Sequence, residues 1–318
     1  MRSVIILLTA SCYRPQPQNC AFTCSANEEC PNGLGCDTDG FCRSDGSLPC
    51  IDAPATPPCD VNARFGPPQR LAGLLDGDSL GQMSPDELTA YLAVMQATTD
   101  YDLFVVTRGS TSEAFSGRTP LSVNTPAREV EPAIDADGLT LLFSRLNPTE
   151  FDVFVATRTS TVAVFGAASL VAGNINEPYF DGNPYLTKNA LYFGSSRIAG
   201  IVDLYRAPRQ GGGFGDPQLL TELDAPENQS RPVVTADELA IYFASQRTSP
   251  GVPQGATDIF LATRPSITVP FGNLRQVDEL STSTFEIPSF ASADHCRLYF
   301  TQLVGGVQAV FVASRPPP

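Results

Sequence analysis

The stretch LAIYFAS at residues 239–245, followed by DIFLATR at residues 258–264, decides the fold, because both halves recur along the chain. The second half is an aromatic-containing run that ends in arginine. Its copies are DLFVVTR at 102–108, DVFVATR at 152–158, DLYRAPR at 203–209, DIFLATR at 258–264 and AVFVASR at 309–315. Self-similarity with a period of about 50 residues indicates a repeat architecture, in which each copy is one supersecondary unit.

Each unit contains further strand-like segments. The run before the arginine run has the copies LTAYLAV at 88–94, LTLLFSR at 139–145, ALYFGSS at 190–196, LAIYFAS at 239–245 and RLYFTQL at 297–303. A short segment such as PVVT at 232–235 precedes it, and an FG-like element such as Phe165-Gly166 follows the arginine. Four strands per unit is the anatomy of a propeller blade. The sequence therefore predicts an all-β fold, a five-bladed β-propeller of four-stranded blades over residues 61–315.

The repeat also carries a family resemblance over about 250 residues. In this repeat an aspartate turn leads to a Leu-Tyr-Phe strand and then to Asp-Ile-Phe-x-Ala-Thr-Arg. The pattern resembles the repeat of TolB-type, WD40-like bacterial propellers. That resemblance implies a rigid platform that binds a protein or another ligand. A repeated β-solenoid is the alternative architecture, but its repeats are usually much shorter.

The register of the repeats predicts how the ring closes. The first FG element, at Phe65, precedes blade 1, whereas the last unit ends at Arg315 without an FG element after it. The segment 65–71 should therefore supply the outer strand of the last blade and remove two exposed edges. In such a meander Cys59 and Cys296 fall on the same face, so we expect a Cys59–Cys296 disulfide, with Cys50 as the alternative partner of Cys296.

The N-terminus predicts export. Residues 1–11 combine one arginine, a short apolar run and small residues directly before Cys12, which resembles a lipoprotein signal followed by its lipidation site. A buried strand with a free cysteine at that position is the alternative. No other stretch has the roughly 18 apolar residues of a spanning helix. We therefore expect a cell-envelope protein that contacts the membrane only through a lipid anchor.

Residues 12–60 form a predicted cysteine-rich segment. The cysteines of this segment other than Cys12 and Cys59 are expected to pair among themselves as disulfides. These cysteines are Cys20, Cys24, Cys30, Cys36, Cys42 and Cys50. Such a high density of cysteines is typical of proteins in an oxidising compartment. A zinc site is the competing interpretation, but there is no CxxC pair and the only histidine is His295, so we expect no metal and no cofactor.

The charge of the chain restricts its partners. It has 20 Lys and Arg against 34 Asp and Glu, a net charge of −14, and Lys188 is its only lysine. Binding a phosphate backbone requires a concentrated positive surface, so a nucleic-acid partner is excluded. We expect an envelope or extracellular protein as the partner, with a glycan as the alternative.

Polar residues before the innermost strands are the candidate ligand-binding site. They belong to loops that a propeller brings together at one mouth of its central channel. These residues are Glu131, Glu177, Asp181, Asn183, Glu227, Arg231 and Glu286. Their carboxylates could bind a cation or a polar ligand, or act as an acid/base pair, but Asn, Asp and Glu before proline also serve simply to make turns.

No catalytic residue is assigned from the sequence. A serine triad is not expected, because the only histidine lies in a turn beside Cys296. Glycosidases of the arabinanase type also have five blades, and their chemistry needs two carboxylates at a controlled spacing. The sequence thus favours a non-enzymatic lipoprotein platform, and a secreted glycan-active hydrolase is the alternative. A deep pocket with two free carboxylates would favour the hydrolase, and a closed channel would favour the platform.

Overall fold

The computed structural model describes residues 35–36, 42–43, 59–97, 100–198, 200–247 and 257–318, and the chain divides into two compact units, residues 1–56 and 57–318. In the first unit, β1 (Gly35–Cys36) pairs antiparallel with β2 (Cys42–Arg43). The expected signal, Cys12 and the other clustered cysteines lie mainly outside the described residues. Within the described part, no helix is long and apolar enough to cross a membrane.

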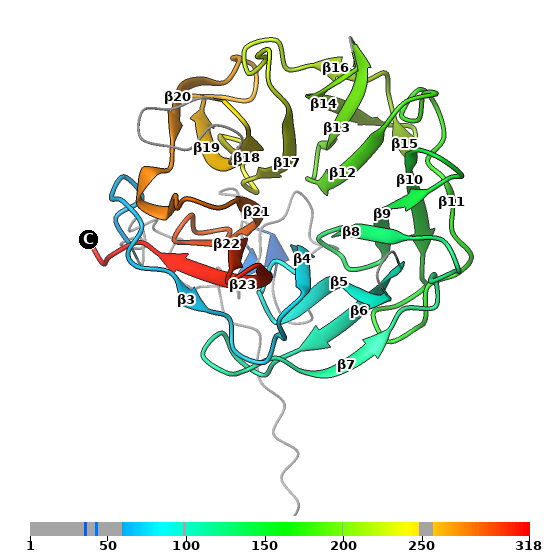
Figure 1. The fold of residues 1–318 in the computed structure, drawn as a ribbon, viewed down its shortest axis with the longest axis horizontal. Helices are drawn as coiled ribbons and strands as arrows, with labels where there is room; N and C mark the ends of the chain where they lie inside the picture. The colour runs from blue at the N-terminus through cyan, green and yellow to red at the C-terminus, as the bar shows by residue number, and fades with distance from the viewer. Residues whose placement is uncertain (1–34, 37–41, 44–58, 98–99, 199, 248–256) are drawn as a thin grey trace, which may run out of the picture. The chain divides into compact units, whose positions relative to one another are not determined.

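The second unit is a five-bladed propeller whose blades follow one another around a ring (Figure 1). Blade 1 contains β4 (Asp78–Met83), β5 (Thr89–Ala97), β6 (Asp100–Thr107) and β7 (Ser116–Pro120). Blade 2 contains β8 (Glu129–Ile134), β9 (Thr140–Leu146), β10 (Phe151–Thr157) and β11 (Ser169–Leu170). Each blade is an antiparallel meander that runs from the ring centre outward. The predicted fold class is confirmed.

The other three blades repeat this plan with local variations. Blade 3 contains β12 (Asp181–Leu186), β13 (Ala190–Ile198), β14 (Ile201–Gln210), β15 (Gly213–Phe214) and β16 (Gln218–Leu219). Blade 4 contains β17 (Gln229–Val234), β18 (Ala240–Ser245), β19 (Asp258–Thr263) and β20 (Gly272–Gln276), which the short 3-10 helix η2 (Asp278–Leu280) follows. Blade 5 contains β21 (Glu286–Ala291), β22 (Arg297–Val304), β23 (Val307–Ser314) and β3 (Gln69–Arg70). Blade 3 differs in that both β15 and β16 pair with β14 at its outer edge.

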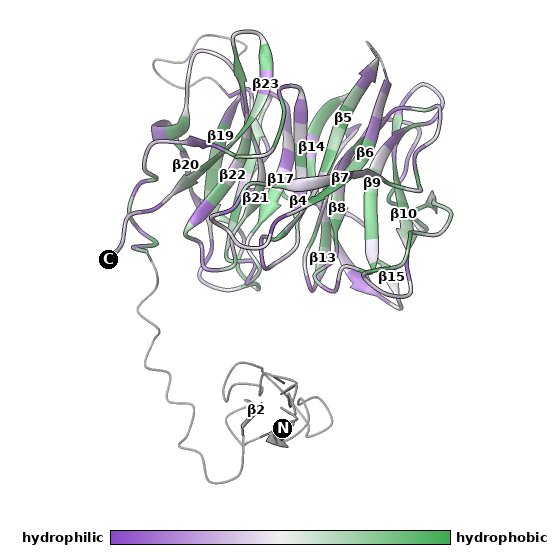
Figure 2. Cartoon of the chain, turned by 90° about the horizontal axis from the view of Figure 1, so that it is seen from below, coloured by the Kyte–Doolittle hydropathy of each residue, from purple (hydrophilic) through white to green (hydrophobic). Residues whose placement is uncertain are grey.

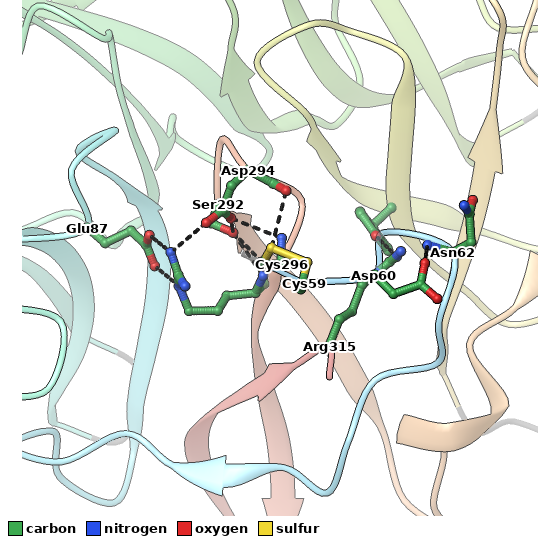
Figure 3. Close-up of a disulfide and its surroundings, with 10 residues drawn as sticks. Cys59, Asp60, Asn62, Glu87, Ser292, Asp294, Cys296 and Arg315 are labelled. Atoms are coloured by element: carbon green, nitrogen blue, oxygen red, sulfur yellow. Dashed lines mark hydrogen bonds and ion pairs between the residues drawn. A yellow bond between two sulfur atoms is a disulfide. The ribbon is translucent and has the colours of Figure 1, made fainter. Parts of the chain in front are cut away.

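The N-terminal strand closes the ring as predicted. β3 pairs antiparallel with β23, with Gln69 opposite Val312, so the first and last parts of the propeller share one blade. The disulfide between Cys59 and Cys296 joins the same two regions, with 5.7 Å between the Cα atoms (Figure 3). Both cysteines are buried. The N-terminal strand therefore covers the edge of β23 and completes blade 5 as a four-stranded sheet.

Aromatic pairs fill the interior of the blades. The second strand of a blade supplies one ring and the third strand supplies the other, with centroids 5.8–6.0 Å apart. The pairs are Phe143–Phe154, Phe193–Tyr205, Phe243–Phe260 and Phe300–Phe311. Figure 2 shows the apolar stretches along the strands and hydrophilic residues at several turns. Buried aromatic area of this kind is a main source of stability in a β-fold.

The repeated arginine and the repeated FG element act together at the seams between blades. In each blade the guanidinium lies 4.2–5.6 Å from the ring of the FG phenylalanine. The pairs are Arg108–Phe115, Arg158–Phe165, Arg209–Phe214, Arg264–Phe271 and Arg315–Phe65. Four of these guanidiniums also donate to a tyrosine hydroxyl of the preceding blade, as in the 3.1 Å bond from Arg158 to Tyr91. Arg209 instead pairs with Asp135 at 2.6 Å. We call this arrangement the arginine clasp.

Candidate functional site

The innermost strands β4, β8, β12, β17 and β21 surround the centre of the ring (Figure 1). We call the space that they enclose the channel, and we describe it in layers of equivalent strand positions. We number the positions from the first residue of each inner strand. The loops that enter these strands form the loop face, and the turns that leave them form the turn face. All the sequence-predicted ligand-binding residues belong to the first three positions or to the loops before them.

Glu131 closes the channel toward the loop face. Its carboxylate oxygens accept a 2.9 Å ion pair from Arg231, a 2.7 Å bond from the Ser144 hydroxyl and a 2.7 Å bond from the Asn183 backbone N–H. These partners come from blades 2, 3 and 4, so one carboxylate joins three blades. Three of the predicted residues, Glu131, Asn183 and Arg231, are therefore brought together, but they satisfy one another.

Backbone bulges place these three side chains at the third position. Each lies within the one register break between its inner strand and the second strand of the blade, and each has a positive φ, with values of 59° for Glu131, 54° for Asn183 and 53° for Arg231. A bulge turns one side chain away from the regular alternation of a strand. Positive φ is uncommon for these residue types, so the surrounding ring holds the backbone in this form.

The fifth position closes the middle of the channel. The Gln82 side chain bridges from blade 1 to blade 3, donating to the Leu186 carbonyl at 2.8 Å and accepting from the Leu186 N–H at 2.9 Å. Tyr185 and Phe290 are buried in the same layer. Between the Glu131 layer and this layer the remaining space is only about 20 Å³. The channel is thus blocked between its two faces.

Asp181 and Glu286, at the first position, are used inside their own blades. Asp181 accepts a 2.8 Å bond from Arg197 and a 2.7 Å bond from the Glu177 N–H, and Glu286 accepts a 3.1 Å bond from the Thr282 N–H. Burial raises the pKa of both carboxyl groups, although these hydrogen bonds oppose the rise. Both are fully buried.

The two remaining predicted carboxylates are peripheral. Glu177 is exposed, and Glu227 lies near Arg247, on which it acts as a favourable charge. The loop 174–183 is described, whereas most of the second variable loop, residues 248–257, lies outside the described residues. The structure therefore does not gather the predicted carboxylates into one open pocket.

A carboxyl pair that the sequence did not reveal lies nearby. Asp203 in β14 is buried, and the neighbouring Asp224 raises its pKa together with burial, to about 6. Arg247 lies close to both aspartates and opposes the rise in the pKa of Asp203. Asp203 is the first residue of its arginine run, as Asp102 and Asp152 are of theirs. Its sequence context alone therefore did not distinguish it from those two residues.

The open end of the channel is on the turn face, opposite the predicted site. A cavity of about 240 Å³ lies there, which we call the turn cup. Its wall is the sixth position of the inner strands, with the buried residues Met83, Ile134, Leu186, Val234 and Ala291. Its rim is the eighth position, with the exposed residues Pro85, Ala136, Lys188, Ala236 and Ala293. The fifth-position side chains of Gln82, Tyr185 and Phe290 form the floor.

Serine chemistry has no support in this geometry. The sequence GDSLG at 77–81 fits the G-x-S-x-G pattern of a nucleophile elbow, but Ser79 lies within the regular strand β4 and not at a strand-to-helix turn. His295 instead pairs with Asp237 of blade 4 at 3.1 Å. Among the residues that the structure describes, no group of three or more His, Cys, Asp or Glu side chains could hold a metal ion.

No protein-family model matches the chain, and no curated protein is similar to it in sequence. Similar solved structures include a thermostable family-43 glycoside hydrolase, which is 13% identical with a TM-score of 0.53 over 78% of this chain and 91% of that chain. The arabinanase Arb43A of Bacillus subtilis is 15% identical with a TM-score of 0.51 over 75% of this chain and 95% of that chain.

TolB from Acinetobacter baumannii is 12% identical with a TM-score of 0.43 over 76% of this chain, and the match spans 56% of the TolB chain. Identities this low report a shared fold and leave activity open. The chain therefore shares the fold of the family-43 glycoside hydrolase and of the arabinanase.

Proposed function

We propose that the protein is a non-enzymatic binding platform of the cell envelope, held at the membrane by a lipid on Cys12. The observation that carries the proposal is the closed loop face of the channel, where Glu131 is bonded to Arg231, Ser144 and Asn183. Hydrolysis of a glycoside needs two available carboxyl groups on either side of the scissile bond, roughly 5–10 Å apart. The first-position carboxylates Asp181 and Glu286 are buried against their own blades and offer no such pair.

The Cys59–Cys296 disulfide supports the exported location. Structural disulfides persist in oxidising compartments and are rare in reducing ones. The lipid anchor rests on the sequence before Cys12 alone. Labelling cells with a radioactive or clickable fatty acid tests it: the full chain should incorporate the label and fractionate with membranes, and Cys12→Ala should do neither. A labelled Cys12→Ala chain, or an unlabelled parent chain, would remove the anchor from the proposal.

Assays with arabinan, arabinoxylan and chromogenic arabinosides test the absence of hydrolysis. The purified, oxidised chain should release no sugar above the buffer control, even at micromolar protein. Release that disappears in Glu131→Gln or Glu286→Gln would instead establish the glycan-active hydrolase. Since those two residues lie in different layers, the pair of variants also shows which carboxyl group is required.

A crosslinking experiment in intact cells tests the platform itself. A photo-reactive amino acid at exposed Tyr179 on the loop face, or at exposed Ala293 on the turn face, should give one discrete crosslinked product with an envelope protein. The same amino acid at exposed Leu170, in the outermost strand β11 of blade 2 and away from both faces, serves as the matched control. Equal products from all three positions would count against a specific binding face.

A further inference from the structure

The turn cup has one charged side chain, Lys188, that has no partner among the described residues. Lys188 stands on the rim where the other blades have proline or alanine, and it is the only lysine in the chain. Its side chain is exposed, and within the described residues its ammonium makes no hydrogen bond or ion pair. The other charged lining residue, Asp135, is paired with Arg209 at 2.6 Å. Within the part of the chain that the structure describes, the cup thus offers apolar walls and one unpaired cation.

Apart from Asp135, the aspartates of the turns that leave the inner strands do not line the cup. Asp86, Asp237 and Asp294 each accept a backbone N–H of their own turn, from Leu88, Leu239 and Cys296 respectively. Asp237 is also paired with His295, and Asp294 with Arg297. None of these aspartates lines the cavity. These carboxylates interact within their own turns. A molecule bound in the cup would therefore meet the positive charge of Lys188.

We propose that the turn cup binds a small amphipathic carboxylate, with its apolar part inside the cup and its carboxylate beside Lys188. This inference rests on the proposed function, for which it names a ligand class. The wall is apolar in all the blades, so burial of an aliphatic or aromatic group is the main driving force. A single ammonium is a point charge that suits a monoanion, whereas a phosphate dianion needs several converging donors, which this wall does not provide.

The size of the cup limits the ligand. Its volume of about 240 Å³ is below that of pockets for drug-sized molecules, which measure roughly 300–1,000 Å³. Octanoate is therefore a suitable probe, with octanamide as the neutral and octylamine as the cationic comparison. Calorimetric titration of the purified, oxidised full chain measures the three dissociation constants. We expect octanoate to bind more tightly than either comparison compound.

Two variants locate the site. Lys188→Met should weaken octanoate binding by about fivefold, the value of a partly exposed ion pair, and leave octanamide binding unchanged. Lys188→Arg should retain the preference for octanoate. Ala293→Trp should abolish binding of all three probes by filling the rim, and its exposed position preserves the fold. Arg64→Met and Ala167→Trp, at exposed positions remote in sequence from the cup residues, are the matched controls and should bind as the parent chain does.

Several outcomes would overturn this assignment. They are the absence of octanoate binding to a folded parent chain, a preference for octanamide or octylamine, and unchanged octanoate binding in Ala293→Trp. The failure of the proposed function is distinguishable from these results. Sugar release in the glycan assays would end the non-enzymatic proposal without altering the titrations, and a chain that binds no octanoate would still be tested as a platform by crosslinking.

Discussion

Arg158 illustrates how a single side chain holds two blades together. Its guanidinium donates to the Gly138 carbonyl at 2.7 Å and to the Tyr91 hydroxyl of the preceding blade, while it stacks on Phe165. We expect Arg158→Met to lower the free energy of unfolding by about 2–3 kcal/mol, because two hydrogen bonds and a cation–π contact are lost. Urea denaturation measures the change.

The control for this prediction is Arg64→Met. Among the described residues, the one ion pair of Arg64 is an exposed contact with Asp278 at 3.6 Å, so its loss should cost no more than about 0.5 kcal/mol. Equal effects of the two substitutions would show that the arginine clasp contributes nothing beyond a surface charge.

Asp203 makes the stability of the propeller depend on pH. Burial and the nearby Asp224 raise its pKa to about 6 in the folded protein, above the value of about 3.9 in an unfolded chain. The folded state therefore favours the protonated acid, and this contribution is fully present below about pH 4 and is lost as the pH rises through about 6. Asp203→Asn should be more stable than the parent chain at pH 7, by no more than about 3 kcal/mol, and should lose less stability between pH 4 and 6.

Denaturation curves at pH 4, 5, 6 and 7 check this prediction. Asp152→Asn is the matched control, since Asp152 has the same position in blade 2 but lies beside the amide of Asn147. A parent chain that gains stability relative to Asp203→Asn as the pH rises would contradict the assigned direction.

At the scale of elements, the inner strands β4 and β8 approach one another closely at Gly81. A Cβ at this position would overlap the carbonyl oxygen of Pro132 in the neighbouring blade. Gly81→Ala should therefore push β4 away from β8 and lower the free energy of unfolding by about 1–3 kcal/mol. Gly272→Ala, where a Cβ meets no atom within 4 Å, should change it by less than about 0.5 kcal/mol. Denaturation of both variants measures the difference, and equal effects would contradict the close approach.

The elements themselves could be predicted because each blade repeats one pattern. The strands, the closing strand at Gln69–Arg70 and the Cys59–Cys296 pair all follow from the register of those repeats. The partners within the channel could not be predicted in the same way. Glu131 and Arg231 come from blades 2 and 4, and their positive φ values give no local signal in sequence.

The turn cup could not be predicted from the sequence for a different physical reason. Its wall residues, such as Ile134 and Val234, look like ordinary buried strand positions, and its rim residues look like ordinary turn residues. Only the ring brings one residue from each blade to the same point. The signal that could have revealed the cup is Lys188, because the only lysine of an acidic chain stands where the other repeats have proline or alanine.

At the scale of the whole molecule, the Cys59–Cys296 disulfide covalently joins the beginning of the propeller to its last blade. It links residues 237 positions apart, and a constraint over a loop this long stabilises the folded state by about 5 kcal/mol in the chain-entropy model. Replacing both cysteines by serine should lower the melting temperature by roughly 10–20 °C, since about 1 kcal/mol corresponds to 2–4 °C for a domain of this size. Differential scanning calorimetry measures the change.

A reductant provides the control for the disulfide prediction. Dithiothreitol should lower the melting temperature of the parent propeller to about that of the double variant and should not destabilise the variant further. A further decrease in the variant would show that cysteines elsewhere in the chain also support the ring.

The closure of blade 5 by β3 also governs when the protein can finish folding. β3 is among the first propeller segments to be synthesised, and its partner β23 is the last strand. With 237 residues between Cys59 and Cys296, the ribosome needs roughly 10–50 s at about 5–20 residues per second to supply the second cysteine. Throughout that interval Cys59 can react with the cysteines that precede it in the chain. Any such pairing must be exchanged before Cys59 can bond to Cys296, so a disulfide isomerase should raise the yield of the closed ring.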